Sequence, residues 1–234
     1  MFNLHRLDHR LYFPSVSRSN AEGIVAFGGD LSPERLLLAY RSGIFPWFDE
    51  ELPILWWSPD PRFVMRPEEV KVSKSMRPVL RSHFRFTFDR AFDRVIAQCR
   101  YTARHDQEGT WITDEMQQAY CRLHHLGHAH SVEVWNNGAL VGGLYGVSLG
   151  AAYFGESMFS HQNNASKAGF IQLCRTLSYF QFQLVDCQVY TRHLARMGAY
   201  NIPRPRFMAL LNEALQQPNH QGSWQSWEGV NWFN

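Results

Sequence analysis

The segment HSVEVWNNGALVGGLYGVSLGAAYFGESMF, residues 130–159, decides the fold of this chain. It contains an uncharged run of twenty residues, Asn136 to Gly155, which is long enough to raise the question of a membrane helix. Six glycines and the polar Ser148 interrupt that run, and the remaining residues are typical of β-strands. We therefore predict three consecutive antiparallel strands, with a turn near Ser148–Gly150, and no membrane span.

Helices are predicted both before and after these strands in the sequence. Ser32 as N-cap, Pro33 in the first turn and Gly43 after the last turn delimit a helix over about 33–42. Apolar spacing predicts further helices at 91–100, 114–126, 165–182 and 207–216. Because these helices are mixed with an antiparallel meander, we predict the α+β class. A change in composition near Pro59–Pro61 predicts an N-terminal domain, 1–60, and a second domain, 61–234.

Composition narrows the function classes. The 234 residues are 45% hydrophobic and 19% charged, as in a folded globular protein rather than a disordered one. A net charge of +2 excludes a protein that binds nucleic acid through its overall charge, but not one with a local basic patch. The cysteines are scattered without a CxxC pair, and no apolar signal segment begins the chain. We therefore expect a reduced, cytoplasmic protein without a disulfide framework or zinc site.

A cluster of histidines follows the 114–126 helix. His124 and His128 have the i, i+4 spacing that could place both side chains on one metal ion. Gly127 ends the helix between them, however, and histidine is favoured near a helix C-terminus by the helix dipole. We favour this structural role and predict no metal.

Aromatic and basic residues suggest a nucleic-acid surface. Residues 44–63, IFPWFDEELPILWWSPDPRF, contain four prolines and six aromatic residues, so an irregular but packed segment is expected. A basic run without an intervening acid follows at Lys74, Arg77, Arg81 and Arg85. Cations beside stacking rings are typical of contacts to phosphates and bases, although a merely solvated face explains the cations equally well.

Polar residues in two otherwise apolar strands are candidates for chemistry. Glu156 interrupts FGESMFS, and Asp186 and Gln188 interrupt LVDCQVY, residues 184–190. Strand alternation places Asp186 and Gln188 on one face, opposite Val185 and Cys187. A buried carboxylate is costly unless it is paired, so these residues form either a catalytic face or a structural hydrogen-bonded pair.

Several long motifs, in this order, resemble the leucyl/phenylalanyl-tRNA–protein transferase family. They are GGDLSPERLLLAYRSGIFPWF, LWWSPDPR, EGTWIT, LHHLGHAHSVEVW, LVGGLYGV, GESMFS, NASK and DCQV, and the resemblance runs from about Phe13 to Arg206. It implies a small N-terminal α/β domain followed by a larger GNAT-like acyltransferase domain. It also implies an enzyme that moves Leu, Phe and, less readily, Met from aminoacyl-tRNA to the N-terminal Arg or Lys of a protein. This transfer would mark the acceptor for degradation through the N-degron pathway.

The same resemblance implies roles for individual residues. Trp47 and Trp111 match positions that hold the 3′ adenosine of the tRNA, and the basic run matches a tRNA-binding surface in character. Glu156, Asp186 and Gln188 match active-site positions. The positions expected to form the aminoacyl side-chain pocket are Leu144, Tyr153, Met158, Leu173 and Leu177.

The chemistry of the implied reaction is compatible with these residues. An aminoacyl-tRNA is an activated ester, so we expect no cofactor, ATP or metal. Our hypothesis is that Asp186 orients Gln188, Gln188 hydrogen-bonds the attacking amine and Glu156 helps to anchor the cationic acceptor. Two alternatives stay open: a GNAT-type acyl-CoA N-acyltransferase and a non-catalytic RNA-binding protein. The first needs a glycine loop before a helix, and SHQNNASK, residues 160–167 at the start of the predicted 165–182 helix, has no glycine. The second leaves the polar strand residues unexplained.

Overall fold

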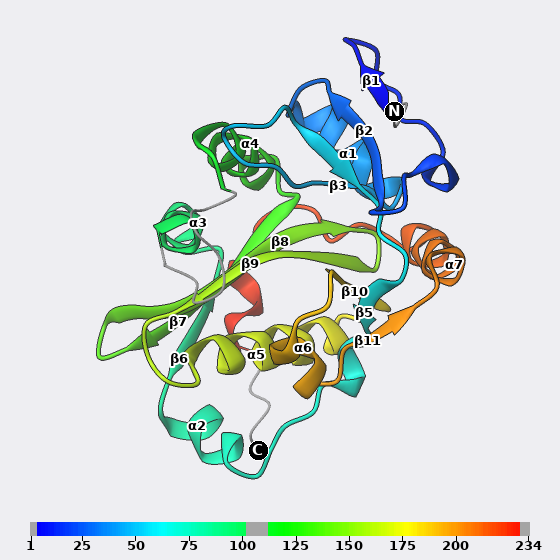
Figure 1. The fold of residues 1–234 in the computed structure, drawn as a ribbon. Coiled ribbons are helices and arrows are strands. Elements are labelled where there is room, and N and C mark those ends of the chain that lie inside the picture. Colours follow the sequence, from blue (N-terminus) through cyan, green and yellow to red (C-terminus); the bar gives the residue numbers. More distant parts are fainter. Residues whose placement is uncertain (1–3, 102–111, 230–234) are drawn as a thin grey trace.

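A computed structural model describes residues 4–101 and 112–229 of the chain and contains two β-sheets (Figure 1). The smaller sheet has the strand order β1-β2-β4-β3 and comes from the N-terminal part of the chain. Its strands are β1 (His5–Leu7), β2 (Ile24–Gly28), β3 (Phe45–Pro46) and β4 (Leu55–Trp57). Helix α1 (Pro33–Arg41) connects β2 to β3, and the Ser32 side chain caps it by accepting from the Arg35 backbone N–H. The predicted helix over 33–42 is therefore confirmed.

The larger sheet has seven strands in the order β11-β5-β10-β9-β8-β7-β6. Strands β7, β8 and β9 are the predicted antiparallel meander, and β10 pairs in parallel with β9. Strand β5 comes early in the chain but lies between β10 and β11, which come late. The strands are β5 (Arg62–Met65), β6 (Arg85–Phe88), β7 (Ala129–Asn136), β8 (Ala139–Leu149), β9 (Ala152–Ser160), β10 (Leu184–Gln188) and β11 (Tyr200–Ile202).

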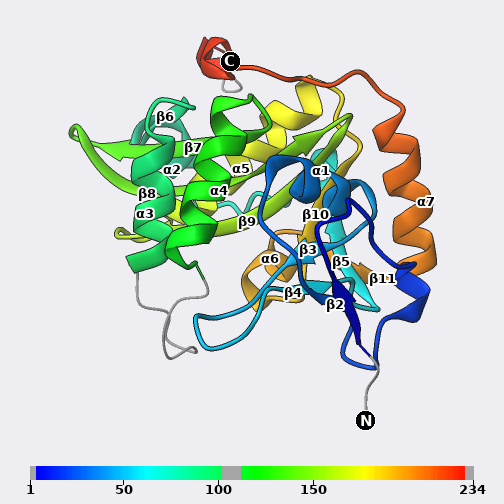
Figure 2. The same ribbon diagram turned by 90° about the horizontal axis from the view of Figure 1, so that it is seen from above.

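Helices cover both faces of the larger sheet (Figures 1 and 2). Helices α3 (Phe92–Tyr101) and α4 (Asp114–His125) pack on one face, and α5 (Ala165–Tyr179) packs on the other. Alternation along β8 and β9 supplies both cores, because Tyr145 and Phe154 join the α3–α4 core whereas Leu144 and Tyr153 join the α5 core. The remaining helices are α2 (Met76–Ser82), α6 (Arg192–Arg196) and α7 (Arg204–Leu215).

These elements confirm the predicted α+β class, and the boundaries differ from the sequence predictions in detail. The turn between β8 and β9 lies at Gly150–Ala151, beside the predicted position. Helix α5 ends at Tyr179 rather than at 182, because Gln181 has a positive φ of 59°. Helix α7 starts at Arg204, earlier than predicted, directly after Pro203. Among residues 4–101 and 112–229, no helix is long and apolar enough to cross a membrane.

Candidate active site

A cavity of about 890 Å³ lies between strands β8, β9 and β10, helices α5 and α6, and the end of β3. Seven of the residues singled out in the sequence line it: Trp47, Leu144, Tyr153, Glu156, Met158, Leu173 and Gln188. Among the described lining residues, most are apolar or aromatic, and the polar ones include Glu156 and Gln188, which contact each other. A site of this kind can hold the apolar side chain of a bound amino acid and present polar groups to the backbone of that amino acid.

Glu156 is the centre of a hydrogen-bond network on β9. The Tyr40 hydroxyl donates to Oε1 at 2.7 Å, and the Tyr120 hydroxyl donates to Oε2 at 2.9 Å. The Gln188 side chain donates through Nε2 to Oε1 at 2.7 Å. Burial raises the pKa of Glu156 to about 7, although these three hydrogen bonds hold it down. Glu156 is therefore a carboxyl group that can change its charge near neutral pH.

Gln188 enters the cavity because β10 is irregular at its end. The pairing of β10 with β5 shifts register between Asp186 and Gln188, and Gln188 has a positive φ of 62°. The prediction that Asp186 and Gln188 share one face is therefore wrong. Regular alternation ends at this bulge, so that Gln188 lines the cavity together with Val185 and Cys187.

Asp186 lies behind the cavity wall in a buried ion pair. Its carboxylate accepts two hydrogen bonds from Arg62, Nε at 2.8 Å and Nη2 at 2.7 Å, and both side chains are at most 1% exposed. The Arg62 guanidinium also lies between the rings of Phe45 and Phe207, 4.8 and 4.5 Å from their centroids. The remaining hydrogen bond of Asp186 is to the Gln188 backbone N–H at 2.9 Å. Asp186 thus holds the backbone of the bulge, whereas Glu156 holds the Gln188 amide.

The apolar part of the cavity contains four of the five predicted pocket residues. Leu177 is the exception: it is fully buried in the α5 core and is not among the lining residues. The described wall also contains apolar residues that were not predicted, among them Phe170, Val185 and Leu194.

The predicted tRNA-binding residues divide into three groups. Trp47 borders the cavity, and its ring packs at 5.4 Å from that of Trp57, which donates to the Trp47 carbonyl. Trp111 lies outside the described residues. The basic run is exposed on and around α2, and none of its residues lines the cavity. The run is Lys74, Arg77, Arg81 and Arg85.

The histidines at and after the end of α4 make local contacts, in keeping with the structural role that the sequence analysis favoured. His124 Nδ1 lies 2.8 Å from the Ala129 carbonyl, and His130 Nδ1 lies 2.9 Å from Asp89 Oδ2. Within the described residues, no group of three potential ligands is arranged to hold a metal ion.

Sequence reasoning also missed three residues that hold the polar groups of the site. Tyr40 and Tyr120 were not singled out. Arg62 stands at the end of the proline-rich segment, where no periodicity marks a partner. The only available signal was that a carboxylate predicted to be buried must have donors, and aromatic hydroxyls or an arginine are suitable ones.

Comparison with protein families gives two matches. Residues 64–212 match the model described as leucyl/phenylalanyl-tRNA protein transferase, and residues 29–60 match its N-terminal domain. A transferase of that name from Syntrophus aciditrophicus (strain SB) is 57% identical over 217 residues, covering 92% of this chain and 91% of the relative. One from Myxococcus xanthus (strain DK1622) is 52% identical and covers 93% of each chain.

Comparison with solved structures gives, among its matches, a GCN5-related N-acetyltransferase from Kribbella flavida. It has a TM-score of 0.37 and 10% sequence identity, and the match covers 72% of this chain and 60% of that one.

Proposed function

The chain belongs to the leucyl/phenylalanyl-tRNA protein transferase family, and from this premise we propose that it moves Leu or Phe, and less readily Met, from aminoacyl-tRNA to the N-terminal Arg or Lys of a protein. The observation that carries the proposal is the cavity, whose mostly apolar lining includes the hydrogen-bonded pair of Glu156 and Gln188. We further propose that the enzyme acts in the cytoplasm and marks its acceptors for the N-degron pathway. The division into domains 1–60 and 61–234 is part of the same proposal.

The reaction needs mainly positioning. The donor ester is already activated, and about a tenth of a free α-amine with a pKa near 8 is neutral at pH 7. Holding amine and ester in attack geometry can contribute about 7–11 kcal/mol to lowering the barrier. A rigid cavity with a few fixed polar groups is suited to that task.

Gln188 is the group proposed to position the amine. Because Glu156 Oε1 accepts from Nε2, the amide oxygen of Gln188 stays available to accept a hydrogen bond from the attacking nitrogen. An amide is not a base, so its role is orientation. Asp186 supports this role by accepting a hydrogen bond from the Gln188 backbone N–H in the bulge. We therefore propose that Asp186 orients the backbone of Gln188 rather than its side chain.

The donor would lie along the cavity from its apolar end to Trp47. Leu144, Tyr153, Met158 and Leu173 would contact the aminoacyl side chain, and Trp47 would stack on the 3′ adenosine. The exposed basic run on α2 would contact phosphates of the tRNA outside the cavity.

To test the proposed activity, the protein is incubated without ATP in the presence of two substrates. These are tRNA that carries radioactive leucine and a peptide that begins with Arg. Transfer of the label to the peptide is expected. A peptide of the same composition that begins with Ala is the control, and equal labelling of both peptides, or of neither, would contradict the proposal.

We expect the pocket to accept Leu over Ile because its shape restricts branching at Cβ. An apolar pocket distinguishes single methylenes by only about 1–3 kcal/mol, so the preference has to come from shape. Met158→Ala should widen the pocket and bring the kcat/KM values for Leu-tRNA and Ile-tRNA closer together. An unchanged ratio in the folded variant would place Met158 outside the aminoacyl subsite.

Removing two charges from α2 should weaken tRNA binding in a salt-dependent way. Each phosphate contact contributes about one unit to the slope of log affinity against log salt, so Arg77→Ala with Arg81→Ala should lower that slope by about two. KM for aminoacyl-tRNA should rise, whereas an aminoacyl-adenosine donor without phosphates should react nearly as before. Equal losses with both donors would exclude a phosphate contact at these arginines.

A further inference from the structure

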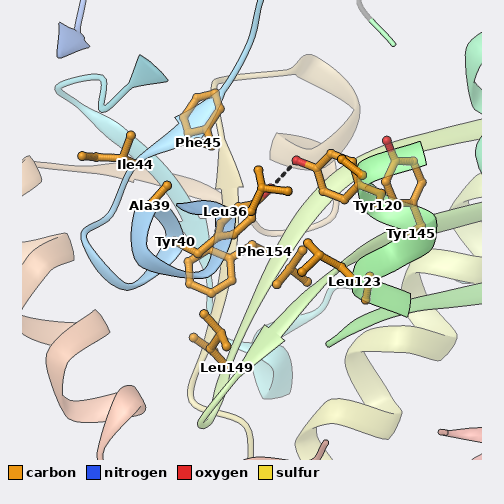
Figure 3. Close-up of a cluster of buried hydrophobic side chains, with 14 of the residues drawn as sticks. Leu36, Ala39, Tyr40, Ile44, Phe45, Tyr120, Leu123, Tyr145, Leu149 and Phe154 are labelled. Carbon is orange, nitrogen blue, oxygen red and sulfur yellow. Dashed lines mark hydrogen bonds between the residues drawn. The ribbon is translucent and has the colours of Figure 1, made fainter. Parts of the chain in front are cut away.

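The environment of Glu156 contains more hydrogen-bonding contacts than the available protons can fill. Tyr40 and Tyr120 each contact one carboxylate oxygen, and their hydroxyls also contact each other. Tyr40 comes from α1 and Tyr120 from α4, and the dashed line that starts at the Tyr120 hydroxyl in Figure 3 marks their contact within a cluster of apolar side chains. Both tyrosines are fully buried. Three oxygen–oxygen contacts therefore share two hydroxyl protons when Glu156 is ionised, and one contact has none.

A proton on Glu156 completes the set. If Oε2 carries it, Oε2–H donates to Tyr120, Tyr120 donates to Tyr40, and Tyr40 donates to Oε1. If Oε1 carries it, the same ring closes in the opposite sense. In both cases Oε1 can still accept from Gln188 Nε2, since an oxygen has two lone pairs. Protonation thus satisfies every contact without disturbing Gln188.

Resting on the proposed function, we propose that Glu156 is the proton acceptor of the reaction: its carboxylate takes a proton from the α-ammonium of the acceptor, and the acid so formed closes a ring of three hydrogen bonds with Tyr40 and Tyr120. Glu156 lines the cavity and is only partly buried, so a bound amine can reach it. The two tyrosines are shut off from the cavity and act as positioning residues.

The proton balance of the transfer is complete. The ammonium gives one proton to Glu156 and becomes a neutral amine. The amine nitrogen attacks the ester carbonyl, the C–N bond forms and the bond from carbon to the 3′ oxygen breaks with its electron pair on oxygen. A second proton passes from nitrogen to the 3′ oxygen. The third stays on the new amide, and Glu156 releases its proton to solvent.

The surroundings of Glu156 suit a proton acceptor for an amine. Burial and the nearby Asp186 raise the pKa of Glu156 to about 7, close to that of an α-ammonium. Tyr40, Tyr120 and Tyr153 keep their protons at this pH, because burial raises their pKa values further above 10. The charge of Asp186 is matched by Arg62. Glu156 is thus the group of this hydrogen-bond network whose pKa lies near neutral pH. His193 also lines the cavity, and burial lowers its pKa below the ordinary value.

The direct test follows the carboxylic acid band of Glu156 by infrared difference spectroscopy against pH, with Glu156→Gln as the blank. The wild type should show an acid band that disappears around neutral pH. Each hydroxyl donated to the ionised carboxylate lowers the pKa of Glu156, but Tyr40→Phe or Tyr120→Phe takes one such bond from the ionised form and two hydrogen bonds of the ring from the acid form. Because the acid form loses more bonds, each variant should lower the midpoint by about half to one pH unit. Tyr200→Phe, on the distant strand β11, should leave it unchanged.

A shift of the Glu156 midpoint in the opposite direction would overturn the proposal. If the tyrosines serve only as donors to an ionised carboxylate, both phenylalanine variants would raise the midpoint, and this would overturn the proposal. A wild type without an acid band near neutral pH, or midpoints unchanged in both variants, would overturn it as well. The two variants are independent, so either one decides the question if the other does not fold.

Kinetics provide the functional part of the test. With saturating Leu-tRNA, the acid limb of kcat/KM for the peptide should follow the infrared midpoint and move to lower pH in the phenylalanine variants. Their plateau should fall by about threefold, because a weaker base removes the proton less readily. In Glu156→Gln the limb at the infrared midpoint should be lost, which leaves only the titration of the peptide's own α-ammonium near pH 8. A limb that persists at the wild-type midpoint would exclude Glu156 as the acceptor. The infrared titration needs no substrate, so absence of transfer in the wild type would refute the proposed function alone.

Discussion

Gln188→Ala is expected to lower kcat by about 10- to 1000-fold while leaving the affinity for aminoacyl-tRNA nearly intact. The variant removes the amide oxygen that orients the attacking amine, but the neutral amine remains a competent nucleophile. Single-turnover rates at saturating donor, together with a direct measurement of donor binding, separate the two quantities. The size of the loss measures how much of the rate depends on orientation at this one position.

Two controls distinguish the amide from the backbone. Gln188 has a left-handed φ of 62°, which alanine tolerates poorly and glycine tolerates well. Gln188→Gly should therefore lose as much kcat as Gln188→Ala, but less stability. Raising the pH should not rescue either variant if orientation is what they lost. A kcat like that of the wild type in both folded variants would leave the residue with a structural role only.

Asp186→Asn is expected to destabilise the protein by about 3–5 kcal/mol, because it leaves the Arg62 guanidinium buried without a counter-charge. For a chain of this size, the melting temperature should fall by roughly 6–20 °C. Asparagine keeps an oxygen that can accept from the Gln188 backbone, so the loss reports mainly on the ion pair. Thermal unfolding followed by circular dichroism measures it.

The matched control is the double variant Arg62→Met with Asp186→Asn. Replacing the unpaired cation by an apolar side chain should recover part of the lost stability, since the desolvation cost of Arg62 disappears. An Asp186→Asn protein with an unchanged melting temperature would show that the ion pair contributes little. A double variant less stable than Asp186→Asn would show that Arg62 stabilises the fold mainly by packing against Phe45 and Phe207.

Local sequence patterns were sufficient to predict much of the fold and part of the candidate active site. The Ser32–Pro33 start of α1 and the glycine-rich meander of β7–β9 were predictable because capping and alternation act over a few residues. Glu156 and Gln188 were recognisable as candidates because polar side chains in apolar strands require an explanation. Both line the cavity.

The partners of these residues were not predictable from local pattern. Arg62 and Asp186 are separated by 124 positions, and Tyr40 and Glu156 by 116, so no periodicity connects them. Tyr40 was not a candidate because the spacing of its helix marks it only as a core residue, and the spacing does not reveal the partner of its hydroxyl. The bulge at Gln188 was missed for a different reason: a left-handed residue other than glycine leaves no clear signal in the sequence.

The place of β5 in the large sheet has a consequence for synthesis on the ribosome. Residues 62–65 emerge early, but the two strands that flank them, β10 and β11, end at residues 188 and 202. At about 5–20 residues per second, β5 waits roughly 7–28 s for its second neighbour. During that interval its backbone and the apolar Phe63, Val64 and Met65 have no permanent cover. A nascent chain stalled between β9 and β10 should therefore be a preferred client of chaperones, and release from this state should coincide with the appearance of β11.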